Sequence, residues 1–223
     1  MNLALAFLME SKPAVKRLVI GLVLAAEFLV GTSSGDQTQW SRSDATLEPR
    51  MRELWDAQAT WTRMYVVSTL GDLPDTSFAR ARLFRCPVDF EAAVGPYYGK
   101  QVAKDFSSAL GRHLNTLVAV VRATRQGDAA ALAALKSSWR TDAESTAAAL
   151  GRINPGWSTP AFRELLDVYL QLTDREVVLR ARGDFSADIG NFGEAHELAL
   201  QLGDVMARGI LSQFPTRPVP GGR

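Results

Sequence analysis

The chain has 223 residues, of which 47% are hydrophobic and 22% are charged, and these proportions exclude wholesale disorder. Lysine and arginine total 25 and aspartate and glutamate total 24, so the net charge of +1 gives no overall attraction for nucleic acid. The single cysteine, Cys86, excludes an intrachain disulfide and a cysteine-based zinc site. We therefore expect one domain that does not bind nucleic acid.

The first 35 residues have the pattern of a secretory signal. Basic residues up to Arg17 precede an apolar run over 18–30, and small residues follow over 31–35. Met9 is an alternative start that gives a shorter leader. The apolar run is short for a spanning helix, which needs about 20 apolar residues, and Glu27 interrupts it.

This pattern predicts an exported protein, secreted or periplasmic, in which residues 1–35 are a cleaved signal peptide. The alternative is an uncleaved membrane anchor, with membrane contact through residues 18–30. Residues 36–46 are polar and predict a linker. The final residues, 216–223, are rich in proline and glycine and predict a disordered tail.

The rest of the chain, 47–215, predicts an all-α domain, because no segment shows strand-like alternation. Asp128 can cap one helix, and Thr159 with Pro160 can open another. A shorter helical segment is expected from about Asp75. Pro87 should split it into two parts, and Gly95-Pro96 should end it. We expect helices over 48–70, from 75 in two parts, and over 100–125, 129–153, 160–182 and 186–214. Four long helices with short turns predict an up-down four-helix bundle with one additional short helical segment.

Helical wheels, turned by about 100° per residue, place polar side chains on faces that should be buried. Each of the last four helices carries at least one such polar side chain near the middle of its apolar face. In the last helix the apolar face is expected to begin at Ile189. Because mid-length positions of antiparallel helices meet at one level, these residues predict a buried polar layer. Its members, as candidate ligand-binding residues, are His113, Asp142, Thr173, Glu176, Arg180 and His196.

Three interpretations of this layer are open. The first is a hydrogen-bonded network that fixes helix register, and the second is a pocket for a small ligand between the helices. The third is a divalent metal site with His113, Glu176 and His196 as ligands, since imidazole and carboxylate suit such metals. The Glu-x-x-His motif of di-iron bundles is missing, and no nucleotide or flavin motif is found.

We therefore expect an exported bundle that is not an enzyme and that binds a small ligand or a metal in the polar layer. One alternative is a metal-dependent enzyme that uses His113 and His196 as ligands with Asp142 or Glu176. Another is a helical protein-interaction module, which requires an exposed apolar patch. The substrate, the ligand and the oligomeric state are left open.

Short motifs spread over all the helices carry a resemblance to a known family. They are Leu54-Trp55, Trp61-Thr62-Arg63, Leu73-Pro74-Asp75, Tyr97-Tyr98-Gly99, His113, Asn154-Pro155 with Trp157, Leu170 with Thr173 and Glu176, and Gly209-Ile210 with Gln213-Phe214-Pro215. On these residues the chain resembles an uncharacterised bacterial family of small exported helical-bundle proteins. The resemblance implies a shared fold and a recurring arrangement of His113, Glu176 and His196, but no reaction.

Overall fold

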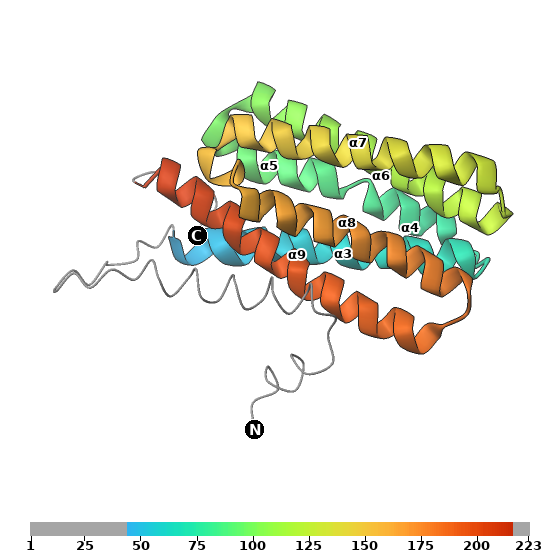
Figure 1. Cartoon of the computed structure of the whole chain (residues 1–223). Helices are drawn as coiled ribbons and strands as arrows, with labels where there is room; N and C mark the ends of the chain where they lie inside the picture. Colours follow the sequence, from blue (N-terminus) through green and yellow to red (C-terminus); the bar gives the residue numbers. More distant parts are fainter. Residues whose placement is uncertain (1–43, 216–223) are drawn as a thin grey trace. The chain divides into compact units, whose positions relative to one another are not determined.

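The computed structural model describes residues 44–215, and this part of the chain is all-helical, without a strand (Figure 1). The all-α prediction is therefore confirmed. The elements in chain order are α3 (Asp44–Leu70), α4 (Thr76–Leu83), α5 (Cys86–Tyr98), α6 (Lys100–Gln126), α7 (Ala129–Ile153), the 3₁₀ turn η1 (Pro155–Trp157), α8 (Pro160–Ala181) and α9 (Phe185–Gln213).

Helix α3 begins at Asp44, inside the predicted linker 36–46. The predicted signal peptide (1–35), most of the linker and the tail (216–223) lie outside the described residues. Among the helices that are described, none combines the length and the apolar character that crossing a bilayer requires.

Local sequence signals explain most helix ends. The Asp128 side chain accepts a hydrogen bond from the backbone N–H of Ala131, and Thr159 does the same for Phe162, so both predicted caps are confirmed. Gly127 ends α6 in the left-handed conformation, with a φ of 68°.

Pro87 splits the α4–α5 segment as predicted and is the second residue of α5, where a helix does not need its N–H. The prediction that Gly95-Pro96 closes this segment is wrong. Helix α5 continues through Pro96 to Tyr98, because one missing N–H does not end a helix. The end comes at Gly99, whose φ of 84° leaves the helical region.

The first and last described helices, α3 and α9, pack closely against each other. A Cβ atom on Gly203 of α9 would lie 2.9 Å from the Cα atom of Arg52 in α3, so only glycine permits this approach. The indole N–H of Trp55 points at the sulfur of Met206, 3.2 Å away. In Figure 1, α8 lies between α7 and α9.

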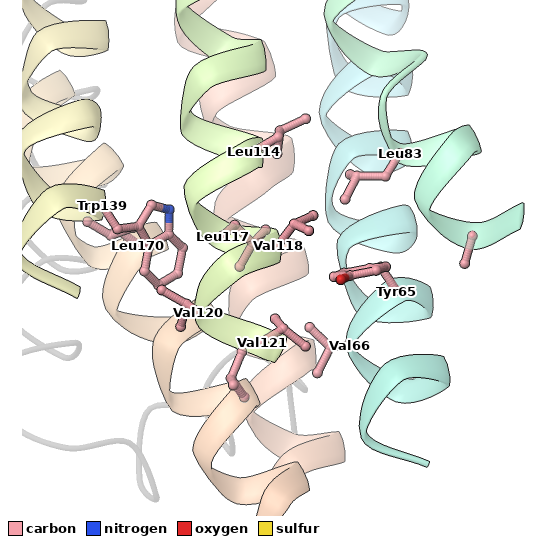
Figure 2. Packing of buried hydrophobic residues seen from close by; sticks show 12 residues of the cluster. Tyr65, Val66, Leu83, Leu114, Leu117, Val118, Val120, Val121, Trp139 and Leu170 are labelled. Carbon is pink, nitrogen blue, oxygen red and sulfur yellow. The ribbon is translucent and has the colours of Figure 1, made fainter. Parts of the chain in front are cut away.

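The core gathers side chains from α3, α4, α6, α7 and α8 (Figure 2). Helix α6 contributes more of them than any other helix, including Leu114, Leu117 and Val121, and Tyr65 of α3 belongs to the same cluster. Helix α7 is different, because Trp139 and Leu150 are its only buried residues. It lies at the edge of the domain in Figure 1, and Leu132, Leu135 and Ala143 pack against the core as partly buried side chains.

The predicted inward face of α9 is corrected in its first two turns. Ile189 was expected inside and is 64% exposed, whereas Asp188 is fully buried. The physical reason is an ion pair: Asp188 meets Arg63 of α3, and this pairing turns the helix so that the neighbouring isoleucine faces solvent. His196, expected at the centre of the face, lies at its edge with a side chain that is 32% exposed.

Candidate functional site

The six predicted polar residues do not form a single layer. The structure places five of them in three groups: His196 in a contact between α3 and α9, Glu176 and Arg180 in an ion network at the α8–α9 end, and His113 and Thr173 at a cavity between α3, α5, α6, α7 and α8. Asp142 belongs to none of the three and contacts Thr116. Only His113 and Thr173 line the cavity. The three groups differ in charge and in exposure to solvent.

His196 belongs to the α3–α9 contact. Its Nε2 lies 2.7 Å from Oδ1 of Asp56, and its ring packs beside Phe192. The side chains of both His196 and Asp56 are partly open to solvent, at 32% and 50% exposed. Its partner is thus a carboxylate of α3, and neither Asp142 nor Glu176. An open pair of this kind contributes at most about 1 kcal/mol to stability.

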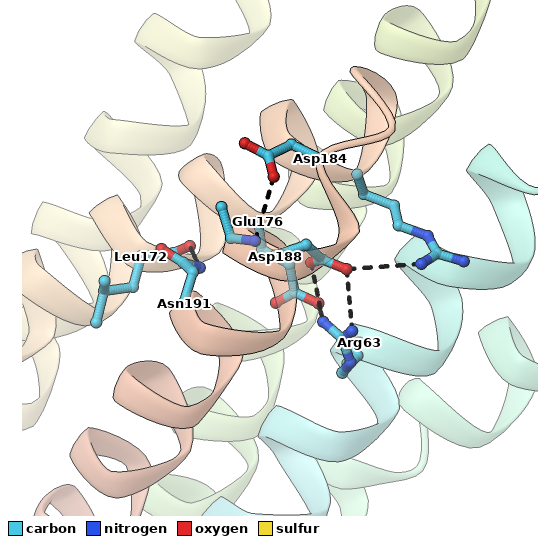
Figure 3. Close-up of polar contacts among 8 residues, drawn as sticks. Arg63, Leu172, Glu176, Asp184, Asp188 and Asn191 are labelled. Carbon is cyan, nitrogen blue, oxygen red and sulfur yellow. Dashed lines mark hydrogen bonds and ion pairs between the residues drawn. The ribbon is translucent and has the colours of Figure 1, made fainter.

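The ion network joins α3, α8 and α9 (Figure 3). The guanidinium of Arg63 donates two hydrogen bonds of 3.0 Å to the Asp188 carboxylate and one of 3.0 Å to Glu176. Arg180 lies 3.6 Å from the same aspartate. Two cations thus face two carboxylates, and the balanced charge favours a structural role.

Burial raises the pKa of Glu176 to about 7, and the neighbouring Arg63 opposes the rise. The carboxyl side chain is 3% exposed, so the loss of hydration outweighs the attraction of the cation. Asn191 extends this region by donating from its amide to the carbonyl of Leu172, 2.8 Å away. The buried polar contacts of Arg63, Glu176, Asp188 and Asn191 therefore link α3, α8 and α9.

His113 lies between α6 and α7, beside Trp139. The indole N–H of Trp139 donates to Nε2 of His113 over 3.2 Å. Burial lowers the pKa of His113 to about 4, with a small opposing effect from Asp142. The ring is therefore neutral at pH 7, and because Nε2 accepts, the proton lies on Nδ1. Asp142 itself accepts from Thr116 Oγ1 over 2.6 Å.

The candidate metal ligands His113, Glu176 and His196 have separate partners and are not brought together. Within residues 44–215 no group of three or more histidine, cysteine, aspartate or glutamate side chains could hold a metal ion. The predicted metal site needs these three side chains at one place, and this structure has them at three different places. The helical wheel placed these residues at one level but could not show which side of the domain each of them faces.

A cavity of about 60 Å³ lies in the interior of the domain. Its walls are mostly apolar, with Trp55, Phe90 and Leu114 among them, and its polar lining consists of Gln58, Thr62, His113, Thr146, Tyr169 and Thr173. Burial raises the pKa of Tyr169, so this phenol stays neutral and can donate or accept a hydrogen bond. A neutral lining of this kind suits an uncharged guest.

Two buried polar atoms of this lining have no hydrogen-bond partner among the described residues. They are Nδ1 of His113 and Oε1 of Gln58. Gln58 is 4% exposed, and its amide nitrogen donates to Thr62 Oγ1 over 3.3 Å. A buried donor and a buried acceptor are thus both available at one cavity, and each costs about 1–3 kcal/mol while it is unpaired.

Sequence reasoning missed Arg63, Asp188 and Gln58. Asp188 was hidden because the neighbouring Ile189 looked like the inward residue. Gln58 had a visible signal, since Trp55, Gln58 and Thr62 are spaced along one face of α3 with Tyr65. The predicted polar layer drew only on the last four helices, and α3 is not one of them.

A groove of about 340 Å³ lies between α7 and α8, beside the cavity. Ala143, Leu166 and Leu170 line both the cavity and the groove, so only these side chains separate the two. A second groove of about 350 Å³ continues along the same pair of helices past Trp139 and Asp174. The cavity is therefore closest to the surface on the α7 side.

No protein-family model, curated protein or solved structure matches this chain. The resemblance to an exported bacterial family stays a prediction. Function is therefore inferred from the geometry of the cavity and its lining.

Proposed function

We propose that this protein binds a small uncharged molecule in the cavity lined by His113 and Gln58. The observation that carries the proposal is the pair of buried atoms, His113 Nδ1 and Gln58 Oε1, that lack a partner among the described residues. A guest that hydrogen-bonds to both atoms recovers the free energy that each costs while it is unpaired. The apolar walls supply the remaining affinity.

An uncharged guest fits the neutral lining. The imidazole of His113 is deprotonated at pH 7, and burial keeps Tyr169 in its neutral form. Transfer of an unpaired charge into such a site costs far more than one hydrogen bond returns. The ion network of Arg63, Glu176 and Asp188 is instead assigned a structural role.

Two further features belong to this proposal. The basic, apolar and small-residue pattern of residues 1–35 supports an exported protein. The short turns at Gly127 and Gly183 support an up-down arrangement of the long helices, with α3 alongside α9.

Xenon tests whether the cavity accepts a guest. We expect ¹²⁹Xe NMR of the full-length chain to show saturable binding, because xenon enters apolar cavities without needing polar contacts. The variant Thr173→Leu fills the cavity with a larger, apolar side chain and should abolish the xenon signal.

The matched control is Thr141→Leu on the exposed side of α7. Both threonine hydroxyls donate to the backbone carbonyl four residues earlier, over 2.9 Å for Thr173 and 3.3 Å for Thr141. The control should therefore bind xenon like the parent chain. Absence of xenon uptake, together with ordered water in the cavity, would contradict the proposal and make the cavity a hydrated structural feature. The cavity is large enough for this, because its 60 Å³ exceeds the roughly 10–15 Å³ that one water needs.

A further inference from the structure

The polar lining specifies which group of a guest enters first. His113 Nδ1 carries a proton and can donate, while Gln58 Oε1 can only accept. A hydroxyl both accepts and donates, so one oxygen atom can serve both partners. A carboxylate cannot donate and an ammonium group cannot accept, and each also brings a charge into a mostly apolar site.

The groove determines which kind of chain the hydroxyl can carry. Its α7 wall includes the small side chains of Ala143, Ala147 and Ala148, and α8 contributes Leu166 and Leu170. These walls suit a narrow hydrocarbon chain. Ala143, Leu166 and Leu170 line both spaces, so cavity and groove share one wall, and Ala143 has the smallest side chain in it.

The rim of the groove does not select a charge. Helix α7 contributes Arg140 and Glu144, and α8 contributes Arg163 and Asp167, so each helix presents one cation and one anion a turn apart. The rim charges sum to zero. Neither an acidic nor a basic outer group is therefore favoured, and specificity is left to the inner end of the ligand.

We propose that the ligand class is a primary alcohol with a linear alkyl chain. Its hydroxyl lies between His113 and Gln58, and its chain leaves the cavity past Ala143 into the α7–α8 groove. This inference rests on the proposed function and names the ligand class for the same cavity.

Calorimetric titration of the full-length chain at pH 7 with four six-carbon probes tests the class. We expect 1-hexanol to bind at least about tenfold more tightly than 1-methoxypentane, which has as many heavy atoms and accepts but cannot donate. Hexanoate and hexylamine should bind more weakly still, because both are charged at this pH. Equal affinity for the alcohol, the ether and either charged probe would overturn the inference.

A pair of α7 variants tests the path past Ala143. Ala143→Leu narrows the connection between cavity and groove and should weaken 1-hexanol binding by more than about tenfold. Ala134→Leu adds the same volume at an exposed position of the same helix that lines neither the cavity nor either groove, so the affinity should change less than about twofold. If both variants behave alike, the alkyl chain does not follow this path.

The two proposals fail in different ways. Uptake of xenon without preference for 1-hexanol contradicts the alcohol class and leaves a binding cavity. Failure of xenon to enter contradicts both. The comparison of the four probes uses the unmodified chain, so it decides the ligand class even if a variant does not fold.

Discussion

Trp139 donates its indole hydrogen to Nε2 of His113 over 3.2 Å, and this one contact decides where the imidazole carries its proton. An indole N–H can only donate, so Nε2 must accept and Nδ1 must hold the hydrogen. Helix α7 thereby sets the chemistry of a residue on α6. An edge helix with two buried residues thus sets the tautomer of a histidine that lines the cavity.

His113→Gln should make the protein less sensitive to acid. The unfolded imidazole binds a proton below about pH 6.5 and the folded one only below about pH 4, so stability is lost as the pH falls through this range. Glutamine keeps an acceptor for Trp139 and does not titrate. Relative to the parent chain, the variant should gain up to about 3 kcal/mol between pH 7 and pH 4. Urea unfolding at several pH values measures the difference, and a difference independent of pH would contradict the assignment.

Glu176→Gln should show the opposite dependence. The folded pKa of about 7 lies above the ordinary value of 4.5, so the stabilising contribution of this carboxyl is present below pH 4.5 and is lost as the pH rises through 7. The stability of the variant relative to the parent should therefore rise by up to about 3 kcal/mol from pH 4.5 to pH 8. Glu53→Gln is the control, because Glu53 forms an exposed pair with Arg50. Thermal unfolding of all three chains across this range checks the slope.

Arg63→Met should be strongly destabilising. It removes both 3.0 Å contacts to Asp188 and leaves this fully buried carboxylate with only the longer contact to Arg180. Loss of one partner from a buried pair costs about 3–5 kcal/mol. Arg50→Met breaks an exposed pair and should cost less than about 1 kcal/mol. Equal losses in urea unfolding would show that Asp188 does not depend on Arg63.

Gly209→Ala should disrupt the end of the domain near η1. The added Cβ would lie 2.3 Å from Nε1 of Trp157, a fully buried and rigid side chain. Overpacking of this kind costs about 1–3 kcal/mol or more. Gly190→Ala is the matched control in the same helix, since its Cβ meets nothing within 4 Å, and alanine there should add up to about 1 kcal/mol. Melting temperatures that move in the same direction would contradict the packing.

Gln58→Met should stabilise the protein and weaken its binding. Methionine has a similar volume but leaves no unpaired acceptor in the cavity, so the free energy of unfolding should rise by about 1 kcal/mol in the absence of a ligand. The same change removes one of the two recognition atoms and should reduce affinity for 1-hexanol. Gln171→Met, at an exposed residue paired with Asp167, should change neither quantity. A loss of stability in Gln58→Met would mean that the amide is satisfied by water.

Helix positions were largely predictable because their signals are local. The capping side chains of Asp128 and Thr159 and the left-handed Gly127 lie within a few residues of the ends that they define. The site was less predictable. His113 and His196 looked equivalent on helical wheels, yet one contacts Trp139 and the other Asp56 of α3.

The burial of Asp188 was hidden for a different reason. Its partner Arg63 lies 125 residues earlier in the chain, and a wheel of one helix carries no information about a distant charge. Hydrophobicity alone favours Ile189 as the inward residue, but the ion pair decides the orientation of the first turns of α9. At this end of the domain the ion pair between Arg63 and Asp188 therefore determines which side of α9 is buried, and the local apolar pattern does not.

The glycine contact between α3 and α9 also has a consequence for synthesis on the ribosome. Arg52 and its partner Asp204 are 152 residues apart, so the apolar face of α3 waits for its neighbour until nearly the whole domain has been translated. At about 5–20 residues per second this interval lasts roughly 8–30 s. Throughout that time the side of α3 that faces α9 stays uncovered in the nascent chain, even once Trp55 can pack against Phe90 of α5, so a chaperone that recognises apolar helices has time to bind there.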